Sequence, residues 1–238
     1  MKRELLSVIS CRPLNGTVFE LKLAGASVMR AGQFVELSVP GFFLRRPISV
    51  ADSEADGTLT LLIKTVGEGT KKLRTLAPGD TLDALTGLGN GFDLDASSPL
   101  LVGGGIGCAP LYKLAKDLAA AGVRPHAVLG FRNAEEMYYV KEFERYCDVT
   151  VATDDGSAGV KGNAVTASAG IPHDRFYACG PQVMLRAAAG TLGRGQVSLE
   201  ARMGCGFGAC MGCSIVTTKG YARVCKEGPV FEAAEVVW

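Results

Sequence analysis

Histidine is scarce in this chain, which has only His126 and His173 among its 238 residues. That scarcity argues against a His-rich metal site and against a Ser-His-Asp hydrolase. Excess charge of either sign is also lacking, because the formal net charge is +1. Neither nucleic acid nor an anionic membrane therefore has an electrostatic reason to bind. No apolar run approaches the roughly 18 residues that a membrane-spanning helix needs.

Cysteine, in contrast, is abundant, with eight residues of two kinds. Four lie singly in apolar surroundings and four are bunched near the C-terminal end. A secreted disulfide framework would space its cysteines more evenly, in a shorter chain. The pattern therefore predicts free thiols and a cytoplasmic location.

The bunched cysteines follow the pattern C-x4-C-x2-C, with a fourth cysteine downstream. They are Cys205, Cys210, Cys213 and Cys225. This spacing is typical of plant-type [2Fe–2S] clusters. Intervening glycines allow backbone N–H groups to approach the sulfurs. A four-cysteine zinc site is the alternative, but such sites usually show two C-x2-C pairs and here there is one.

The position of the fourth ligand follows from a predicted hairpin over residues 214–225. A two-residue turn at Lys219-Gly220 would set Thr218 opposite Tyr221 and Ser214 opposite Cys225. Cys225 would then lie beside Cys213.

The fold class predicted is α+β multidomain. Short apolar runs at 5–9, 18–23, 34–39, 48–51 and 58–65 indicate a small antiparallel β-barrel over residues 1–97. Strands and helices then alternate, which predicts an α/β parallel sheet covered on both faces over residues 98–195. The strands are expected at 100–102, 127–129, 149–153 and 176–179, and the helices at 110–121, 135–146 and 181–191. Residues 196–238 form the cysteine-rich segment.

Two glycine turns in the α/β region are candidate nucleotide sites. Gly105-Ile106-Gly107-Cys108-Ala109-Pro110 follows a strand and opens a helix, where a pyrophosphate can approach closely. Pro110 stands where the third glycine of the dinucleotide fingerprint would be. Cys179-Gly180-Pro181 repeats the arrangement at the carboxyl end of a later strand. Either turn, alone, is also compatible with an ordinary helix start.

The barrel region has its own candidate phosphate site. Arg45-Arg46-Pro47-Ile48-Ser49 places two cations and a hydroxyl around a rigid proline, and arginine grips phosphate well. Gly67-Glu68-Gly69-Thr70 leads into a helix expected from Lys71. A solvated strand end is the simpler interpretation of the arginines.

Together these motifs resemble the ferredoxin–NADP reductase-like flavoproteins. Arg46-Pro47-Ile48-Ser49 is similar to the flavin motif R-x-Y/F-S, although Ile48 replaces the aromatic residue, which makes the flavin's affinity and potential less predictable. The loop 105–110 is similar to G-x-G-x-x-P. Within that superfamily the whole chain resembles the electron-transfer subunits of NAD-linked dihydroorotate dehydrogenase, through the phrases GTKKLRTLAPGDTLDALTGLGNGF, LLVGGGIGCAPL, ATDDGS, CGP, ExRMGCGFGACMGC and VCKEGPVF.

The resemblance implies three cofactors: FAD in the barrel, NAD in the α/β domain, and a C-terminal [2Fe–2S] cluster on the four bunched cysteines. Arg46 would contact the FAD pyrophosphate and Ser49 would lie near flavin N5. The other implied FAD and NAD residues are Pro47, Ile48, Ile63, Lys64, Thr65, Gly69, Thr70, Gly105, Gly107, Cys179, Gly180 and Pro181.

A nicotinamide exchanges two electrons at once and a [2Fe–2S] cluster one, so a flavin is needed between them. No residue of this chain is a convincing base for abstracting a carbon-bound proton, so no catalytic residue is predicted. The resemblance implies a separate FMN subunit that oxidises dihydroorotate in pyrimidine biosynthesis, in a heterotetramer of two copies of each subunit. Electrons would pass from that FMN through the cluster and FAD to NAD+, and the cluster segment would face the partner.

NAD is expected rather than NADP because Asp154 and Asp155 end the third strand of the α/β region. NADP-using relatives tend to have Ser-Arg there, and two carboxylates would repel a 2′-phosphate. The aspartates could instead only cap a turn.

Two other functions stay open at this point. Reductase subunits of the sulfide dehydrogenase or ferredoxin:NADP oxidoreductase type share the domain order, but they have an Asp at the first cluster position, where this chain has Cys205. A zinc-stabilised nucleotide-binding module is the alternative of another class.

Overall fold

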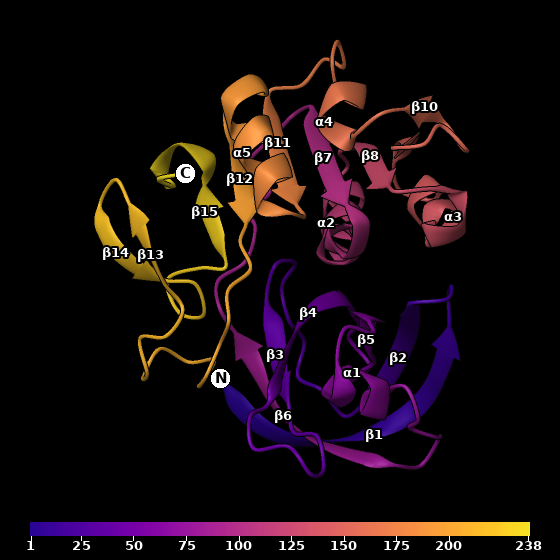
Figure 1. Cartoon of the computed structure of the whole chain (residues 1–238), viewed down its shortest axis with the longest axis vertical. Coiled ribbons are helices and arrows are strands. Elements are labelled where there is room, and N and C mark those ends of the chain that lie inside the picture. Colours follow the sequence, from indigo (N-terminus) through magenta and orange to yellow (C-terminus); the bar gives the residue numbers. More distant parts are fainter.

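The N-terminal part of the computed structural model, which describes all 238 residues, is a closed antiparallel barrel with strand order β1-β2-β5-β4-β3-β6 (Figure 1). Its strands are β1 (Lys2–Pro13), β2 (Val18–Ala24), β3 (Phe34–Leu37), β4 (Arg46–Ser53), β5 (Leu59–Lys64) and β6 (Thr81–Leu88). In β6 the side chains of Leu82, Ala84 and Leu88 are buried on alternate positions, the pattern of a strand with one face on a core. A short helix, α1 (Glu68–Leu73), joins β5 to β6. The predicted barrel is confirmed.

The second part is a seven-stranded sheet of order β10-β9-β8-β7-β11-β12-β15. Its strands are β7 (Pro99–Gly104), β8 (His126–Phe131), β9 (Asp148–Thr153), β10 (Val160–Lys161), β11 (Arg175–Cys179), β12 (Gly195–Ser198) and β15 (Val230–Glu232). All pairs are parallel except β12–β15. β12 crosses the expected boundary at residue 196, and β15 belongs to the C-terminal segment, which is therefore joined to the sheet by hydrogen bonds.

Helices cover both faces of this sheet, as predicted. Leu101 and Tyr177 pack with α2 (Cys108–Ala120) and α3 (Val140–Glu144), whereas the neighbouring residues Leu100 and Phe176 pack with α4 (Ala164–Ala167) and α5 (Gln182–Thr191). Strands buried on both faces explain the continuous apolar runs in the sequence. None of the helices has the length and apolar character needed to cross a membrane.

The helix predicted over residues 135–146 is wrong in its first half. A 3₁₀ turn (Ala134–Glu136) is followed by Tyr139 in the left-handed region, with φ 60°, and only then does α3 begin. Two adjacent tyrosines reach different partners: the hydroxyl of Tyr138 donates to the carbonyl of Gly105 at 2.8 Å, and that of Tyr139 donates to Glu20 of the barrel. These tertiary contacts override the helical pattern.

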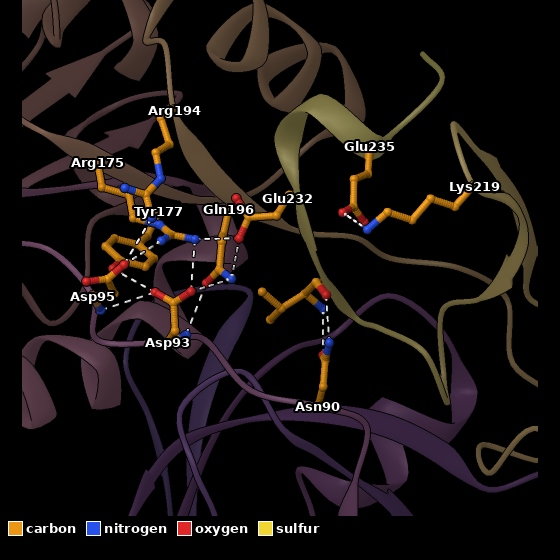
Figure 2. Close-up of polar contacts among 11 residues, drawn as sticks. Asn90, Asp93, Asp95, Arg175, Tyr177, Arg194, Gln196, Lys219, Glu232 and Glu235 are labelled. Carbon is orange, nitrogen blue, oxygen red and sulfur yellow. Dashed lines mark hydrogen bonds and ion pairs between the residues drawn. The ribbon is translucent and has the colours of Figure 1, made fainter.

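A buried arginine joins the C-terminal segment to the rest of the molecule (Figure 2). The side chain of Arg175 in β11 is 3% exposed and pairs with Asp93 at 2.9 Å and with Glu232 of β15. Gln196 of β12 donates to the same two carboxylates, at 3.0 and 2.9 Å. Because Asp93 lies on the linker that follows the barrel, this group fixes β15 against both the linker and the sheet.

The remaining two strands, β13 (Ser214–Thr217) and β14 (Gly220–Arg223), form a hairpin. It begins directly after Cys213, the third of the four bunched cysteines. Figure 1 shows it at the side of the sheet, beyond β15.

Candidate electron-transfer site

One cavity, of about 350 Å³, lies between the barrel, the start of α2 and the chain that follows β12. Most of the residues expected to bind FAD line it. These are Arg46, Pro47, Ile48, Ser49, Ile63, Lys64 and Thr70. Gly107 and Cys179 line the same cavity from the sheet side, while Leu199, Met203 and Pro229 close it from the C-terminal segment. We call it the flavin cavity.

Thr65 and Gly69, the other two expected residues, are not among the lining but support it. The hydroxyl of Thr65 is buried and has no hydrogen-bond partner, although buried polar groups are nearly always paired. Gly69 lies against the guanidinium of Arg46, and a Cβ there would come within 2.4 Å of Arg46 Nε. The residues present thus fit a polar, phosphate-bearing group, because the Arg46 guanidinium packs directly on Gly69 at the cavity and the buried Thr65 hydroxyl has no other partner.

A second cavity, of about 450 Å³, opens at the carboxyl ends of β7, β8, β9 and β11, where open α/β sheets bind their ligands. Of the residues predicted to bind the nucleotide, Gly105, Gly180 and Pro181 line this cavity, whereas Gly107 and Cys179 line only the flavin cavity. Arg132 adds a cation to the wall. We call it the nucleotide cavity.

The two cavities adjoin, because Lys64, Ile106 and Glu200 line both. Close contact between the two glycine turns makes this possible: a Cβ on Gly107 would lie 2.3 Å from the carbonyl oxygen of Cys179. Any side chain on Gly107 would therefore push the two turns apart.

The two aspartates that end β9 differ in their surroundings. Asp154 lines the nucleotide cavity. Asp155 caps the next turn instead, accepting from the backbone N–H of Ser157 at 2.9 Å and from its hydroxyl at 2.6 Å, and these bonds lower its pKa. Turn capping is therefore the observed role of Asp155, while the discrimination against NADP remains a prediction for Asp154.

Two site residues escaped the sequence reasoning. Burial raises the pKa of the Glu200 carboxyl, which faces both cavities. Its position two residues after β12, at the carboxyl edge of the sheet, was the available signal. The second is Tyr138, whose hydroxyl donates a hydrogen bond to the carbonyl of Gly105. Nothing in the local sequence distinguishes Tyr138 from Tyr139.

The four bunched cysteines are free thiols and interact in two pairs. The sulfur of Cys205 accepts the backbone N–H groups of Ala209 at 3.2 Å and Cys210 at 3.4 Å, and the Cys210 thiol bonds to it. The N–H of Cys225 reaches the Cys213 sulfur at 3.4 Å, and the two thiols interact.

Two pairs of thiols suit a two-iron core in which each iron takes two thiolates. Burial opposes ionisation of Cys205, but its N–H donors outweigh burial and lower its pKa to about 6. A thiolate is the form that binds iron. No set of three or more His, Cys, Asp or Glu side chains has the arrangement that would hold a single metal ion.

The predicted hairpin exists, but its register was wrong. Ser214 pairs with Arg223 and not with Cys225, because the turn falls at Thr218 and Lys219. The hydroxyl of Thr217 closes this turn by donating to Gly220 O at 2.8 Å. A shift of two residues keeps the same faces together. Cys225 still lies beside Cys213, as expected.

A barrel and a mainly parallel sheet with adjoining cavities, followed by a cysteine-rich segment, define an oxidoreductase with the ferredoxin reductase-like fold. Solved structures agree. An NADH-dependent reduced ferredoxin–NADP oxidoreductase matches 99% of this chain and 90% of its own with TM-score 0.90 and 32% identity. Phthalate dioxygenase reductase, at 18% identity, covers 91% of this chain and 87% of its own with TM-score 0.69 and shares the fold.

Sequence relatives define the family. Residues 200–237 match the iron–sulfur cluster binding domain of dihydroorotate dehydrogenase B. The electron transfer subunits of dihydroorotate dehydrogenase B (NAD(+)) from Bacillus caldolyticus and Listeria monocytogenes are 43% and 40% identical, over 99% and 97% of this chain and 98% and 97% of theirs. The chain belongs to this family of electron transfer subunits, and the expected resemblance is confirmed.

Proposed function

We propose that this chain passes electrons from the FMN of a catalytic partner, through a [2Fe–2S] cluster and FAD, to NAD+. The observation that supports this order most directly is the position of the flavin cavity. It adjoins the nucleotide cavity through Lys64, Ile106 and Glu200, and the cysteine-bearing segment closes its other side through Met203 and Pro229. A group bound there lies between the two other sites.

The FAD supplies the conversion between two-electron and one-electron transfer when it is bound. The protein contributes positions and charges. Arg46, seated on Gly69, would contact the pyrophosphate, and Thr65 would donate its unused hydroxyl. Lys64 and Glu200 face the place where the flavin ring and the nicotinamide would meet.

The four cysteines would hold the cluster, with Cys205 and Cys210 on one iron and Cys213 and Cys225 on the other. The N–H groups that bond the sulfurs of Cys205 and Cys213 would remain as donors to the bound thiolates. Such second-shell donors tune the potential of a cluster. Because all eight cysteines are free, a reducing cytoplasm is the proposed location.

The partner would dock at the cluster end of the molecule. Phe207 and Met211 are 43% and 54% exposed beside the exposed Cys210. On the hairpin, Val216 and Tyr221 are directly paired, at 49% and 82% exposure. Exposed apolar surface of this kind marks an interaction site. A complex of two copies of each subunit is the proposed assembly.

The test is reconstitution with an FMN-containing dihydroorotate-oxidising subunit under anaerobic conditions. We expect NADH formation that depends on both dihydroorotate and this chain. Cys225→Ser should abolish it while leaving NADH-dependent reduction of an artificial dye by the FAD. Cys11→Ser, which alters a thiol far from the cluster segment, should behave as the wild type. Full activity of Cys225→Ser would contradict the proposed route.

A further inference from the structure

The barrel ends in the loop Gly87-Leu88-Gly89-Asn90-Gly91, which lines neither cavity. One residue of this loop, Asn90, makes several hydrogen bonds to a distant part of the chain. The Asn90 side chain donates from Nδ2 to the carbonyls of Glu227 at 3.0 Å and Val230 at 2.7 Å, and its Oδ1 accepts the N–H of Val230 at 3.0 Å. Its backbone N–H donates to Gly228 O at 2.7 Å. One residue of the loop that ends the barrel therefore holds a segment some 140 positions away; Figure 2 marks hydrogen bonds of the Asn90 side chain with dashed lines.

Only an asparagine in this orientation satisfies both ends of the contact. The two Nδ2 hydrogens meet two carbonyl oxygens, while the amide oxygen meets an N–H. Aspartate has the same shape but no hydrogen to donate, and it would set a charge against the two carbonyls.

The loop at the end of the barrel has no side chain at Gly89, where this segment packs against it. Gly89 has φ +69°, and a Cβ on it would lie 2.5 Å from Pro229 Cδ and 2.9 Å from Gly228 O. Gly89, the glycine before Asn90, thus lets the segment 227–230 approach the backbone of the barrel.

The segment held by Asn90 connects two cofactor sites. At one end it follows Cys225 by two residues, through a turn closed by Arg223 and Glu227. At the other end Pro229 lines the flavin cavity, and its carbonyl accepts the N–H of Leu199 at 2.9 Å. Three residues therefore separate Cys225, a proposed iron ligand, from Pro229 in the wall of the flavin cavity.

We infer that Asn90 is a positioning residue, which fixes the separation between the cluster and the flavin and so sets the rate of electron transfer between them. This inference rests on the proposed function. Electron transfer between separated centres falls steeply with distance, so a cluster that shifts away from the flavin is reduced more slowly. The residue touches neither cofactor, and it acts through segment 227–230.

The experiment compares Asn90→Ala and Asn90→Asp with the wild type and with Asn15→Ala as the control. Asn15 also bridges the barrel to a distant backbone carbonyl, that of Glu136 at 2.9 Å, but this residue lies in the 3₁₀ turn beside the nucleotide cavity rather than on the cysteine-bearing segment. Anaerobic holoproteins are mixed with NADH in a stopped-flow instrument, and flavin reduction and cluster reduction are followed separately. Hydrogen exchange is measured on peptides covering residues 223–232.

In both Asn90 variants we expect flavin reduction within twofold of the wild type and cluster reduction slower by roughly tenfold or more. Exchange at 227–230 should be faster by roughly tenfold to 100-fold, from the lost hydrogen bonds. Asn15→Ala should change neither the rate of cluster reduction nor the exchange at residues 227–230. Faster exchange with an unchanged cluster rate would overturn the inference, because the clamp would then be structural only.

Two other outcomes are equally informative. If both Asn90 variants lose iron or FAD, the clamp serves retention of the cofactors, and the inference is contradicted. If the wild-type protein itself holds no cluster or no FAD, the proposed function fails before Asn90 is tested.

Discussion

Asp154 and Asp155 are adjacent in the sequence, but only Asp154 faces the nucleotide cavity, because Asp155 is committed to the turn with Ser157. Charge near the ribose is what distinguishes the two nicotinamide cofactors, so their different surroundings assign the preference for NAD to one carboxylate.

Asp154→Arg should therefore raise the ratio of NADPH to NADH activity by roughly tenfold, because it replaces a repulsion with an attraction for the 2′-phosphate. Steady-state dye reduction with each nucleotide measures the ratio. Asp155→Asn keeps the turn-capping oxygen and should leave the ratio as it is. A change in the Asp155 variant alone would show that the assignment is reversed.

Glu36, on β3, is a buried carboxyl under the cysteine-bearing segment. It is 1% exposed, its Oε1 has no partner, and a Cβ on Gly206 would lie 2.5 Å from that atom. Burial, which outweighs the nearby Arg45, raises its pKa from 4.5 to about 7. Between these two values the folded protein holds a proton that the unfolded chain has released, so stability falls as pH rises through that window and is level above it.

Glu36→Gln should abolish this dependence. The wild type should lose about 2–3 kcal/mol of unfolding free energy between pH 5 and pH 8 that the variant keeps. Unfolding of anaerobic holoprotein by urea at several pH values measures the difference. Glu68→Gln, at an exposed site, should follow the wild type. Parallel pH profiles for Glu36→Gln and the wild type would show that the carboxyl is charged throughout.

At the scale of elements, the sequence predicted most strands but missed contacts made between distant parts. Alternation of apolar residues is a local signal, so the barrel strands, the sheet strands and the helix near 181–191 could be read from it. The break at Tyr139 could not, because it depends on Glu20 and Gly105. The hairpin turn could not either, since β13 also pairs with the C-terminal residues, through Thr217 and Val236.

The candidate site shows the same division between residues that local motifs predict and residues whose roles depend on distant contacts. Motif spacing predicted flavin, nucleotide and cysteine residues along the chain, and the structure brings most of the first two groups to adjoining cavities. Glu200 and Asn90 lie within stretches that carry the family resemblance, but no local pattern gives either residue a role. Their roles follow only from which remote backbone or cavity they face.

The pairing of β15 with β12 depends on the group around Arg175, so this element should be sensitive to its charge. Removing the arginine leaves Asp93 and Glu232 close together and without their cation. Breaking a fully buried ion pair from one side costs about 3–5 kcal/mol, but Asp93 and Glu232 are 41% and 38% exposed, so water reduces the cost here to about 1–3 kcal/mol. Arg175→Met should therefore lower the apparent Tm of the holoprotein by roughly 3–10 °C.

Arg194→Ala is the matched control, because Arg194 is 64% exposed and pairs only with the exposed Asp95, an interaction worth at most about 1 kcal/mol. Differential scanning calorimetry measures both variants. Equal Tm values for Arg175→Met and the wild type would mean that β15 is held mainly by its backbone and by Asn90.

At the scale of the whole molecule, the C-terminal segment is built into the other two parts. It contributes β15 to the sheet, is clamped to the barrel by Asn90, and forms one wall of the flavin cavity. A chain folded in this way holds an iron centre at a fixed place relative to the flavin. That arrangement explains why one polypeptide carries all three sites.

The most direct measurement is an anaerobic titration of the purified chain with NADH, together with iron, acid-labile sulfide and flavin analysis. The structure predicts about one FAD, two iron and two sulfide per chain, and a reduced-cluster electron paramagnetic resonance signal that grows after the flavin is reduced. A chain that contains neither iron nor sulfide, or one whose cluster stays oxidised while NADH fully reduces its flavin, would contradict the account.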